Sequence, residues 1–253
     1  MMKPLLAFVA SFSLSGCATA APDPALDPIV VQLGGAARLI LIGEIHGTVE
    51  TPAAFGRIAE EASRAWGRVN VGVELPQSAL DEADCARPEP RSDSYWRRPA
   101  QDGRTSKAMR SLVCSLKRLE ENRRIRLLAI VPADFGGSAT HPYYETVITA
   151  VRNGPSRTLL LLGNFHARRA PGALAQLLAR EGVKLTTLTV SSPSATAWNC
   201  RAPGQCGPGQ IGAQFCDASP TAVQLVLGDK SKMRSPYWDG CLAFPSLSPS
   251  PPA

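Results

Sequence analysis

Short apolar runs, separated by segments with helical spacing, constrain this chain more than any other feature. Residues 39–42 (Leu-Ile-Leu-Ile) and 159–162 (Leu-Leu-Leu-Leu) are uninterrupted apolar tetrads, the pattern of strands that are covered on both faces. Further strands are predicted at 69–73, 125–131, 183–190 and 222–227. Apolar residues at helical spacing predict helices within 55–66, 109–119, 147–151 and 174–178. This alternation predicts an α/β domain of three layers around a mostly parallel central sheet.

The first residues have the pattern of an export signal. Lys3 precedes the apolar run 5–10, and Leu14-Ser15-Gly16-Cys17 follows, so residues 1–16 are predicted to be a secretory signal peptide. The run is too short to span a bilayer as a helix. The last four residues resemble the bacterial lipobox, which implies that Cys17 is acylated, as in palmitate-carrying lipoproteins, and anchors the chain to a lipid bilayer. The alternative is an ordinary signal cut near residues 20–21.

The residue after the anchor and the next segments predict where the protein lies. Ala18 rather than Asp follows the cysteine, so we expect an outer membrane lipoprotein that faces the periplasm. Residues 17–28 hold three prolines and are predicted to form a lipidated tether. One domain is expected over 29–245, in which the Cys-, Gly- and Pro-rich part 198–245 is a disulfide-rich appendage. The Ser/Pro-rich tail 246–253 is predicted to be disordered.

The cysteine count predicts disulfide bonds. Seven cysteines are present, and six remain when Cys17 is assigned to lipid. An even remainder in an oxidising compartment favours disulfides, and the Cys-x-x-Cys pairs of zinc sites are absent. Six cysteines allow fifteen connectivities. Pairing nearest neighbours predicts the bridges Cys85–Cys114, Cys200–Cys206 and Cys216–Cys241.

Charge and missing motifs exclude several classes of function. The formal net charge is +6, and the basic residues are spread along the chain, without a basic-aromatic nucleic-acid module. We therefore expect no nucleic-acid partner and a solvated surface with weak attraction to anionic lipid or substrate. No Gly-x-Ser-x-Gly elbow is present, and neither a P-loop nor a dinucleotide-binding glycine pattern follows a predicted strand, which removes the main support for serine-hydrolase and nucleotide-binding functions.

Two strand ends share one local pattern. Gly43-Glu44-Ile45-His46 follows the first apolar tetrad, and Gly163-Asn164-Phe165-His166 follows the second. Ligands bind beyond the carboxyl ends of strands in parallel sheets. If the chain stays extended past each glycine, Glu44 faces the same way as His46, and Asn164 the same way as His166. Glu74 ends another predicted strand, and Glu50 lies close behind the first.

These strand-end residues predict chemistry of one of two kinds. Two imidazoles and a carboxylate, from His46, His166 and Glu74, can bind Zn, Mn or Fe at an open site. They can equally form a general acid/base cluster without metal. Glu44 is the expected general base, because it shares a face with His46.

Other polar residues receive weaker assignments. Glu50 and Asn164 are expected to orient water or substrate. His141 is expected at the surface. Asp134 is either a strand-end carboxylate or a helix N-cap, and each strand-end histidine has the alternative role of capping its strand.

Residues 43–47 with Glu50, 72–76 and 163–167 together resemble the superfamily that joins erythromycin esterases, haem-binding ChaN-type lipoproteins and TraB/TIKI-type proteins. The resemblance covers roughly residues 35–190. Its TIKI-type branch implies a divalent-metal peptidase site at His46, Glu74 and His166, and its esterase branch implies that the corresponding His and Glu activate water. The ChaN-type branch implies a lipid anchor and iron or haem binding. The large helical insert of the esterases is absent from this chain.

The combined expectation is a membrane-anchored periplasmic hydrolase, dependent on a divalent metal, that cleaves an ester or peptide bond in a small-molecule or peptide substrate. The alternative is a haem- or iron-binding lipoprotein without catalysis. A third possibility is a relative that keeps the fold and has only a structural role.

Overall fold

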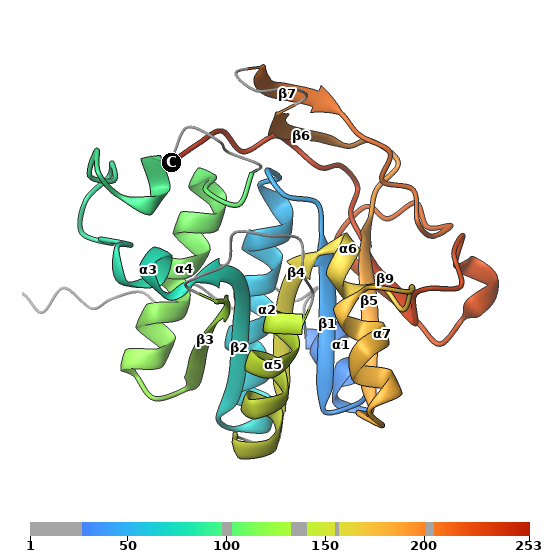
Figure 1. Cartoon of the computed structure of the whole chain (residues 1–253). Coiled ribbons are helices and arrows are strands. Elements are labelled where there is room, and N and C mark those ends of the chain that lie inside the picture. The colour runs from blue at the N-terminus through green and yellow to red at the C-terminus, as the bar shows by residue number, and fades with distance from the viewer. Residues whose placement is uncertain (1–26, 98–102, 133–140, 155–156, 201–204) are drawn as a thin grey trace, which may run out of the picture.

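The computed structural model describes residues 27–97, 103–132, 141–154, 157–200 and 205–253. Among these residues, seven strands form a central sheet with helices on both faces (Figure 1). The predicted α/β class is therefore confirmed. The strands are, in chain order, β1 (Leu39–Glu44), β2 (Val69–Pro76), β3 (Ile125–Val131), β4 (Thr158–Gly163), β5 (Leu185–Ser191), β8 (Gln224–Leu227) and β9 (Gly240–Ala243).

The order of strands in the sheet is β3-β2-β4-β1-β5-β9-β8. All neighbours are parallel except β8, which runs antiparallel to β9. Although β4 comes late in the chain, it lies between β1 and β2. The carboxyl ends of these three strands therefore lie side by side at the same end of the sheet.

Helices complete the three layers by burying the two faces of the strands. In β1, Ile40 and Ile42 join the apolar cluster beneath α1 to α4, whereas Leu39 and Leu41 join the cluster beneath α5 to α7. This alternation explains the uninterrupted apolar tetrad, because both faces of the strand are covered. The helices are α1 (Asp27–Gly34), α2 (Glu50–Trp66), α3 (Gln77–Asp81), α4 (Lys107–Glu121), α5 (His141–Asn153), α6 (Asn164–Ala167) and α7 (Leu174–Arg180), with short 3-10 turns at η1 (Tyr95–Arg97) and η2 (Lys230–Lys232).

The C-terminal part is less separate than the sequence predicted. A hairpin of β6 (Thr196–Cys200) and β7 (Cys206–Gln210) does project from the end of the sheet where β1 and β4 end (Figure 1). By contrast, β8 and β9 extend the central sheet, because β9 pairs in parallel with β5. The segment 198–245 is therefore partly a component of the main sheet.

All three predicted disulfides are present, and each has a different structural position. Cys85–Cys114 joins the loop after α3 to α4, Cys200–Cys206 closes the hairpin, and Cys216–Cys241 ties a loop to β9. Nearest-neighbour pairing along the chain therefore gave the correct connectivity.

The tail 246–253 is ordered, contrary to the prediction. Leu247, Ser250 and Ala253 are buried, and the tail backbone exchanges hydrogen bonds with residues 47–49 and 105–107. The prolines lack an N–H group, but their carbonyl oxygens still accept hydrogen bonds, and the apolar side chains between them reach the core. Composition alone missed this packing.

Several sequence-based assignments lie outside the described residues. They are the signal peptide, Cys17, most of the tether and Asp134. At the tether's end, α1 already begins at Asp27, which is two residues before the predicted domain boundary. Among the described helices, none is both long and apolar enough to cross a bilayer.

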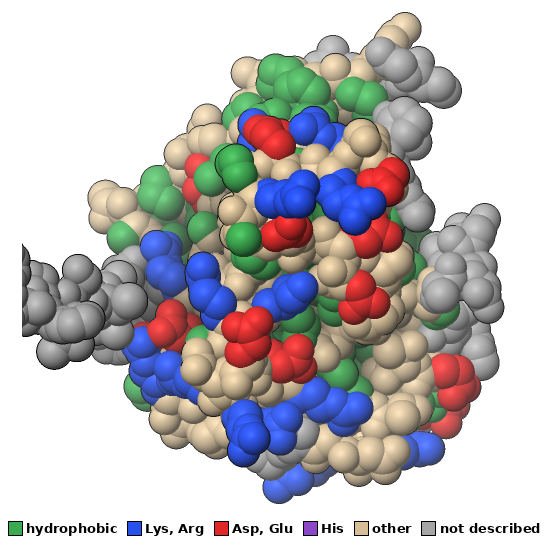
Figure 2. Space-filling view, turned by 90° about the vertical axis from the view of Figure 1, so that its left-hand side faces the viewer, with side chains coloured by type: hydrophobic (Ala, Val, Ile, Leu, Met, Phe, Trp, Pro, Cys, Tyr) green, Lys and Arg blue, Asp and Glu red, His purple; other side chains and the backbone are tan. Residues whose placement is uncertain are grey.

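Charged side chains of both signs are mixed on the face that Figure 2 shows, on the side of α3 and α4. This distribution agrees with the expected solvated surface, since interspersed charges create no large field of one sign.

Candidate functional site

The candidate site lies where β2, β4 and β1 end side by side. Glu44 and Gly163 are register partners in the β1–β4 pair, and Glu74 is near the end of β2 on the other side of β4. The two similar strand-end motifs are thus neighbours in space, offset by one residue in the ladder.

Glu44 and His46 form a carboxylate–imidazole pair. The Nδ1 atom of His46, in the turn after β1, lies 2.9 Å from Oε1 of Glu44. Because a carboxylate accepts hydrogen bonds, Nδ1 carries the hydrogen and the lone pair is left on Nε2. The Glu44 side chain is 1% exposed and that of His46 is 20% exposed, so the imidazole is the more accessible group of the pair.

Glu74 contacts several of the other groups of the site. Its Oε1 lies 3.2 Å from a guanidinium nitrogen of Arg104 and accepts a hydrogen bond from the Tyr143 hydroxyl at 3.4 Å. Its Oε2 accepts a hydrogen bond from the backbone N–H of Gly163. A carboxylate that is 4% exposed needs such partners, since burial of an unpaired charge is costly.

Both strand-end histidines, His46 and His166, face the Glu74 carboxylate. Nε2 of His46 lies 3.9 Å from Oε2 of Glu74, and Nε2 of His166 lies 3.9 Å from Oε1. These separations exceed a hydrogen bond, but one water molecule can bridge each of them. His46, Glu74 and His166 therefore converge, as the sequence predicted.

Gly163 is required by the close approach of these groups. A Cβ atom at this position would lie 2.8 Å from Nε2 of His46 and 3.3 Å from Oε2 of Glu74. Because Gly163 has no side chain, it leaves the space in which the His46 imidazole and the Glu74 carboxylate approach each other.

His166 is held by aromatic neighbours. Its ring stacks on Tyr143, with centroids 4.6 Å apart and an interplanar angle of 21°, and meets Phe165 edge-on at 5.3 Å. Burial lowers the pKa of His166, and the nearby Glu74 carboxylate only partly opposes this shift. The His166 imidazole is therefore neutral near pH 7. Burial also raises the pKa of Tyr143, which keeps its hydroxyl protonated as a donor.

Two residues assigned to the site from sequence have other contacts. Asn164 begins the short helix α6, and its Oδ1 accepts a hydrogen bond from the Thr189 hydroxyl at 3.1 Å. The expectation that the backbone stays extended past Gly163 was therefore wrong for this strand. Glu50 accepts a hydrogen bond from the backbone N–H of Ser248 at 2.8 Å, so it holds the C-terminal tail.

Sequence reasoning missed Arg104 and Tyr143. Arg104 lies in the loop before α4, and Tyr143 lies in the first turn of α5. Neither follows a strand of the sheet directly, so the strand-end pattern includes neither of them. A buried carboxylate such as Glu74 needs a cation or hydrogen-bond donors from elsewhere in the chain, but the sequence does not show which residues supply them.

In the observed arrangement these donors do not fit a metal centre. Among the described residues, no three His, Cys, Asp or Glu side chains are arranged to hold a metal ion. The guanidinium of Arg104 contacts Oε1 of Glu74, so a cation already takes one of the predicted ligand atoms. Metal ligation by His46, Glu74 and His166 stays a prediction.

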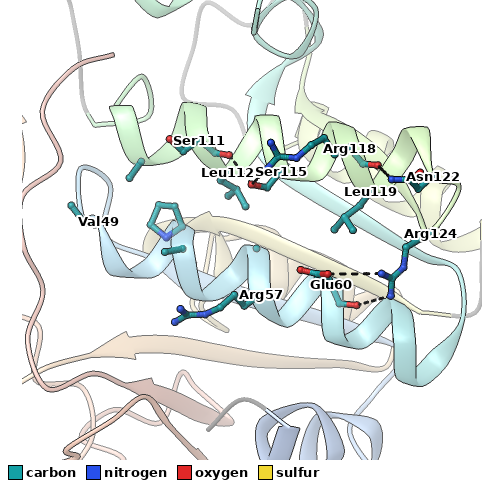
Figure 3. A pocket seen from close by; sticks show the side chains of 14 residues that line it. Val49, Arg57, Glu60, Ser111, Leu112, Ser115, Arg118, Leu119, Asn122 and Arg124 are labelled. Atoms are coloured by element: carbon teal, nitrogen blue, oxygen red, sulfur yellow. Dashed lines mark hydrogen bonds and ion pairs between the residues drawn. The ribbon is translucent and has the colours of Figure 1, made fainter. Parts of the chain in front are cut away.

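A cavity of about 1020 Å³ lies apart from these residues, between α2 and α4 (Figure 3). Leu112 and Leu119 point into it from α4, and Arg124 reaches across it to Glu60. None of the strand-end residues lines it.

Comparison with known proteins supports the fold only. No family model and no curated protein matches the chain. A protein of known structure from Bacillus cereus is similar with a TM-score of 0.63 at 12% identity, covering 90% of this chain and 93% of its own. A succinoglycan biosynthesis protein is similar with a TM-score of 0.64 at 11% identity, covering 91% of this chain and 93% of its own. Membership of the superfamily named from the motifs therefore stays a prediction.

Proposed function

We propose that this protein is a hydrolase in which the Glu44–His46 pair activates a water molecule. The observation that carries the proposal is the 2.9 Å contact between Glu44 and Nδ1 of His46, which leaves Nε2 facing the Glu74 carboxylate. A buried carboxylate behind an imidazole is the arrangement by which hydrolytic enzymes fix the tautomer of a general base.

The proton transfers follow from this geometry. A water that lies beside the line joining Nε2 of His46 and Oε2 of Glu74, which are 3.9 Å apart, donates one hydrogen to Nε2 and the other to Oε2. When this water attacks a carbonyl carbon, Nε2 takes its proton, and Glu44 stabilises the imidazolium that forms. The protonated imidazole then returns the proton to the leaving group. Arg104 and the neutral His166 border the same carboxylate.

We assign the substrate to the carboxylic esters or peptides expected from the sequence. The resemblance to erythromycin esterases, whose His and Glu are proposed to activate water, supports a reaction that needs only side chains. On the sequence alone, we further propose that the mature chain is lipid-anchored through Cys17 and faces the periplasm.

The test uses the mature chain with a panel of p-nitrophenyl esters and chromogenic peptides, after treatment with a chelator. We expect hydrolysis by the wild type, loss of activity in His46→Ala, and partial rescue of His46→Ala by added imidazole, which supplies the missing base. Rescue separates a missing base from a misfolded variant.

Three outcomes would contradict the proposal. Hydrolysis that survives in His46→Ala would remove His46 as the base. Activity that appears only after Zn, Mn or Fe is added would favour the metal-dependent alternative. A Soret band in the purified protein, without hydrolysis of any probe, would favour the haem-binding alternative.

A further inference from the structure

An exposed aromatic residue, Phe165, lies beside the candidate site. Phe165 is 51% exposed, whereas most large apolar side chains of the fold are buried. It lies in α6 next to His166, and the two rings meet edge-on at 5.3 Å. The Phe165 ring therefore offers apolar surface directly beside the His166 imidazole.

Arg168 lies on this ring. Its Cζ atom is 4.7 Å from the centroid of Phe165, within the range of a cation–π contact. The stacking fixes the plane of the guanidinium, so that less freedom is lost when it binds an anion.

The guanidinium of Arg168 has unused hydrogen-bonding capacity. Its Nε is buried, yet it has no hydrogen-bond partner among the described residues. Within the same part of the chain, no Asp or Glu forms an ion pair with Arg168. Neighbouring Arg169 is different, because it pairs with Asp239 at 2.9 Å. Because Nε is buried, an anionic ligand would reach the guanidinium through its two Nη groups, which have no hydrogen-bond partner among the described residues.

We propose that Phe165 and Arg168 form a subsite that binds a carboxylate group of the substrate. The inference rests on the proposed hydrolase function, because it names the substrate class as small esters that carry a carboxylate at a distance from the scissile bond. A planar guanidinium binds a carboxylate through two parallel hydrogen bonds, and the Phe165 face adds apolar contact for the chain between the two groups.

Binding tests the subsite without turnover. Phenylacetate and its uncharged match phenylacetamide are titrated against the ¹⁵N-labelled mature protein, and the Nε–Hε resonance of Arg168 is followed. We expect phenylacetate to bind about tenfold tighter than phenylacetamide, the factor that one charge-assisted hydrogen bond typically supplies. Arg168→Gln should abolish this preference and Arg168→Lys should keep part of it. Arg180→Gln, which removes an exposed positive charge on α7, should leave it unchanged.

Turnover tests the substrate class. The p-nitrophenyl hemiester of succinate should have a higher kcat/KM than its uncharged methyl ester, and Arg168→Gln should bring the two values together. Equal binding of phenylacetate and phenylacetamide, or a preference that survives in Arg168→Gln, would overturn the subsite. Selective binding of phenylacetate without any hydrolysis would instead overturn the proposed function and leave the subsite standing.

Discussion

At the scale of single residues, the site depends on the hydrogen-bond partners of two buried carboxylates. Glu74 has a different kind of partner on each oxygen, a guanidinium and a hydroxyl on Oε1 and a backbone N–H on Oε2. Glu44 also has a buried oxygen, Oε2, with no hydrogen-bond partner among the described side chains and backbone. The two buried carboxylates therefore differ, because Glu74 has partners on both oxygens whereas Glu44 has His46 on one oxygen.

Gly163→Ala tests how closely the His46 imidazole must approach β4. The added methyl group would lie 2.8 Å from Nε2 of His46 and must push the imidazole or the backbone aside. We expect kcat to fall by roughly 10²-fold or more, because displacements of about 1 Å have effects of that size. Gly212→Ala is the matched control, since nothing lies within 4 Å of its Cβ position. Equal ester hydrolysis by the two variants would contradict the geometry.

His166 predicts a pH dependence of stability. Because burial lowers its pKa below the ordinary value of 6.5, the unfolded chain binds more protons than the folded one below about that pH. The free energy of unfolding should therefore fall as the pH falls through this range. The other groups titrate in wild type and in His166→Gln alike, so the variant should lose less stability than the wild type. Urea unfolding at several pH values measures the difference, and parallel curves would refute the assignment.

At the scale of elements, the C-terminal tail connects the two loops that carry site residues. The N–H of Ser250 donates to Gly47, next to His46, and the N–H groups of Lys107 and Ala253 exchange hydrogen bonds with Pro251 and Thr105, next to Arg104. Gly47 has a positive φ of 77°, and its Cβ position is filled by the backbone of Trp198. The hairpin and the tail therefore fix the loop after β1 from two sides.

Removal of residues 246–253 tests this role. The variant loses four backbone hydrogen bonds to the two loops and the burial of Leu247, so unfolding free energy should fall by about 2–4 kcal/mol, and ester hydrolysis should fall with it. Ser248→Ala is the control, because Ser248 is exposed and bonds through its backbone. A truncated chain with unchanged stability and activity would show that the tail contacts are unimportant.

Local patterns predicted elements better than they predicted partners. The strand at 125–131 has the same bounds in the structure, because its apolar run ends sharply at both sides. Strand β9 was missed, since Gly-Cys-Leu-Ala is too short to show a period and pairs with β5, some fifty residues earlier. Arg104 and Tyr143 were missed for the same reason, because long-range packing alone brings them to Glu74.

At the scale of the whole molecule, the lipid anchor remains a sequence-based prediction. Cys17→Ser should prevent acylation and alter signal processing, because the thiol is the acceptor of the lipid. Intact-mass measurement of the membrane fraction compares the variant with the wild type. A wild-type mature N terminus without acyl chains would contradict the anchor.

The central claim is that Glu44 acts through His46 on a water molecule, and the most direct test is the kcat/KM of Glu44→Gln for ester hydrolysis. The amide keeps the size of the carboxylate but has no negative charge to stabilise the imidazolium, and its NH2 group can donate to Nδ1 and so favour the wrong tautomer. We predict a decrease of roughly 10²–10⁴-fold in a variant that unfolds at the wild-type temperature. A decrease of less than about twofold would contradict the account, because loss of the carboxylate that supports a general base should lower the rate by a large factor.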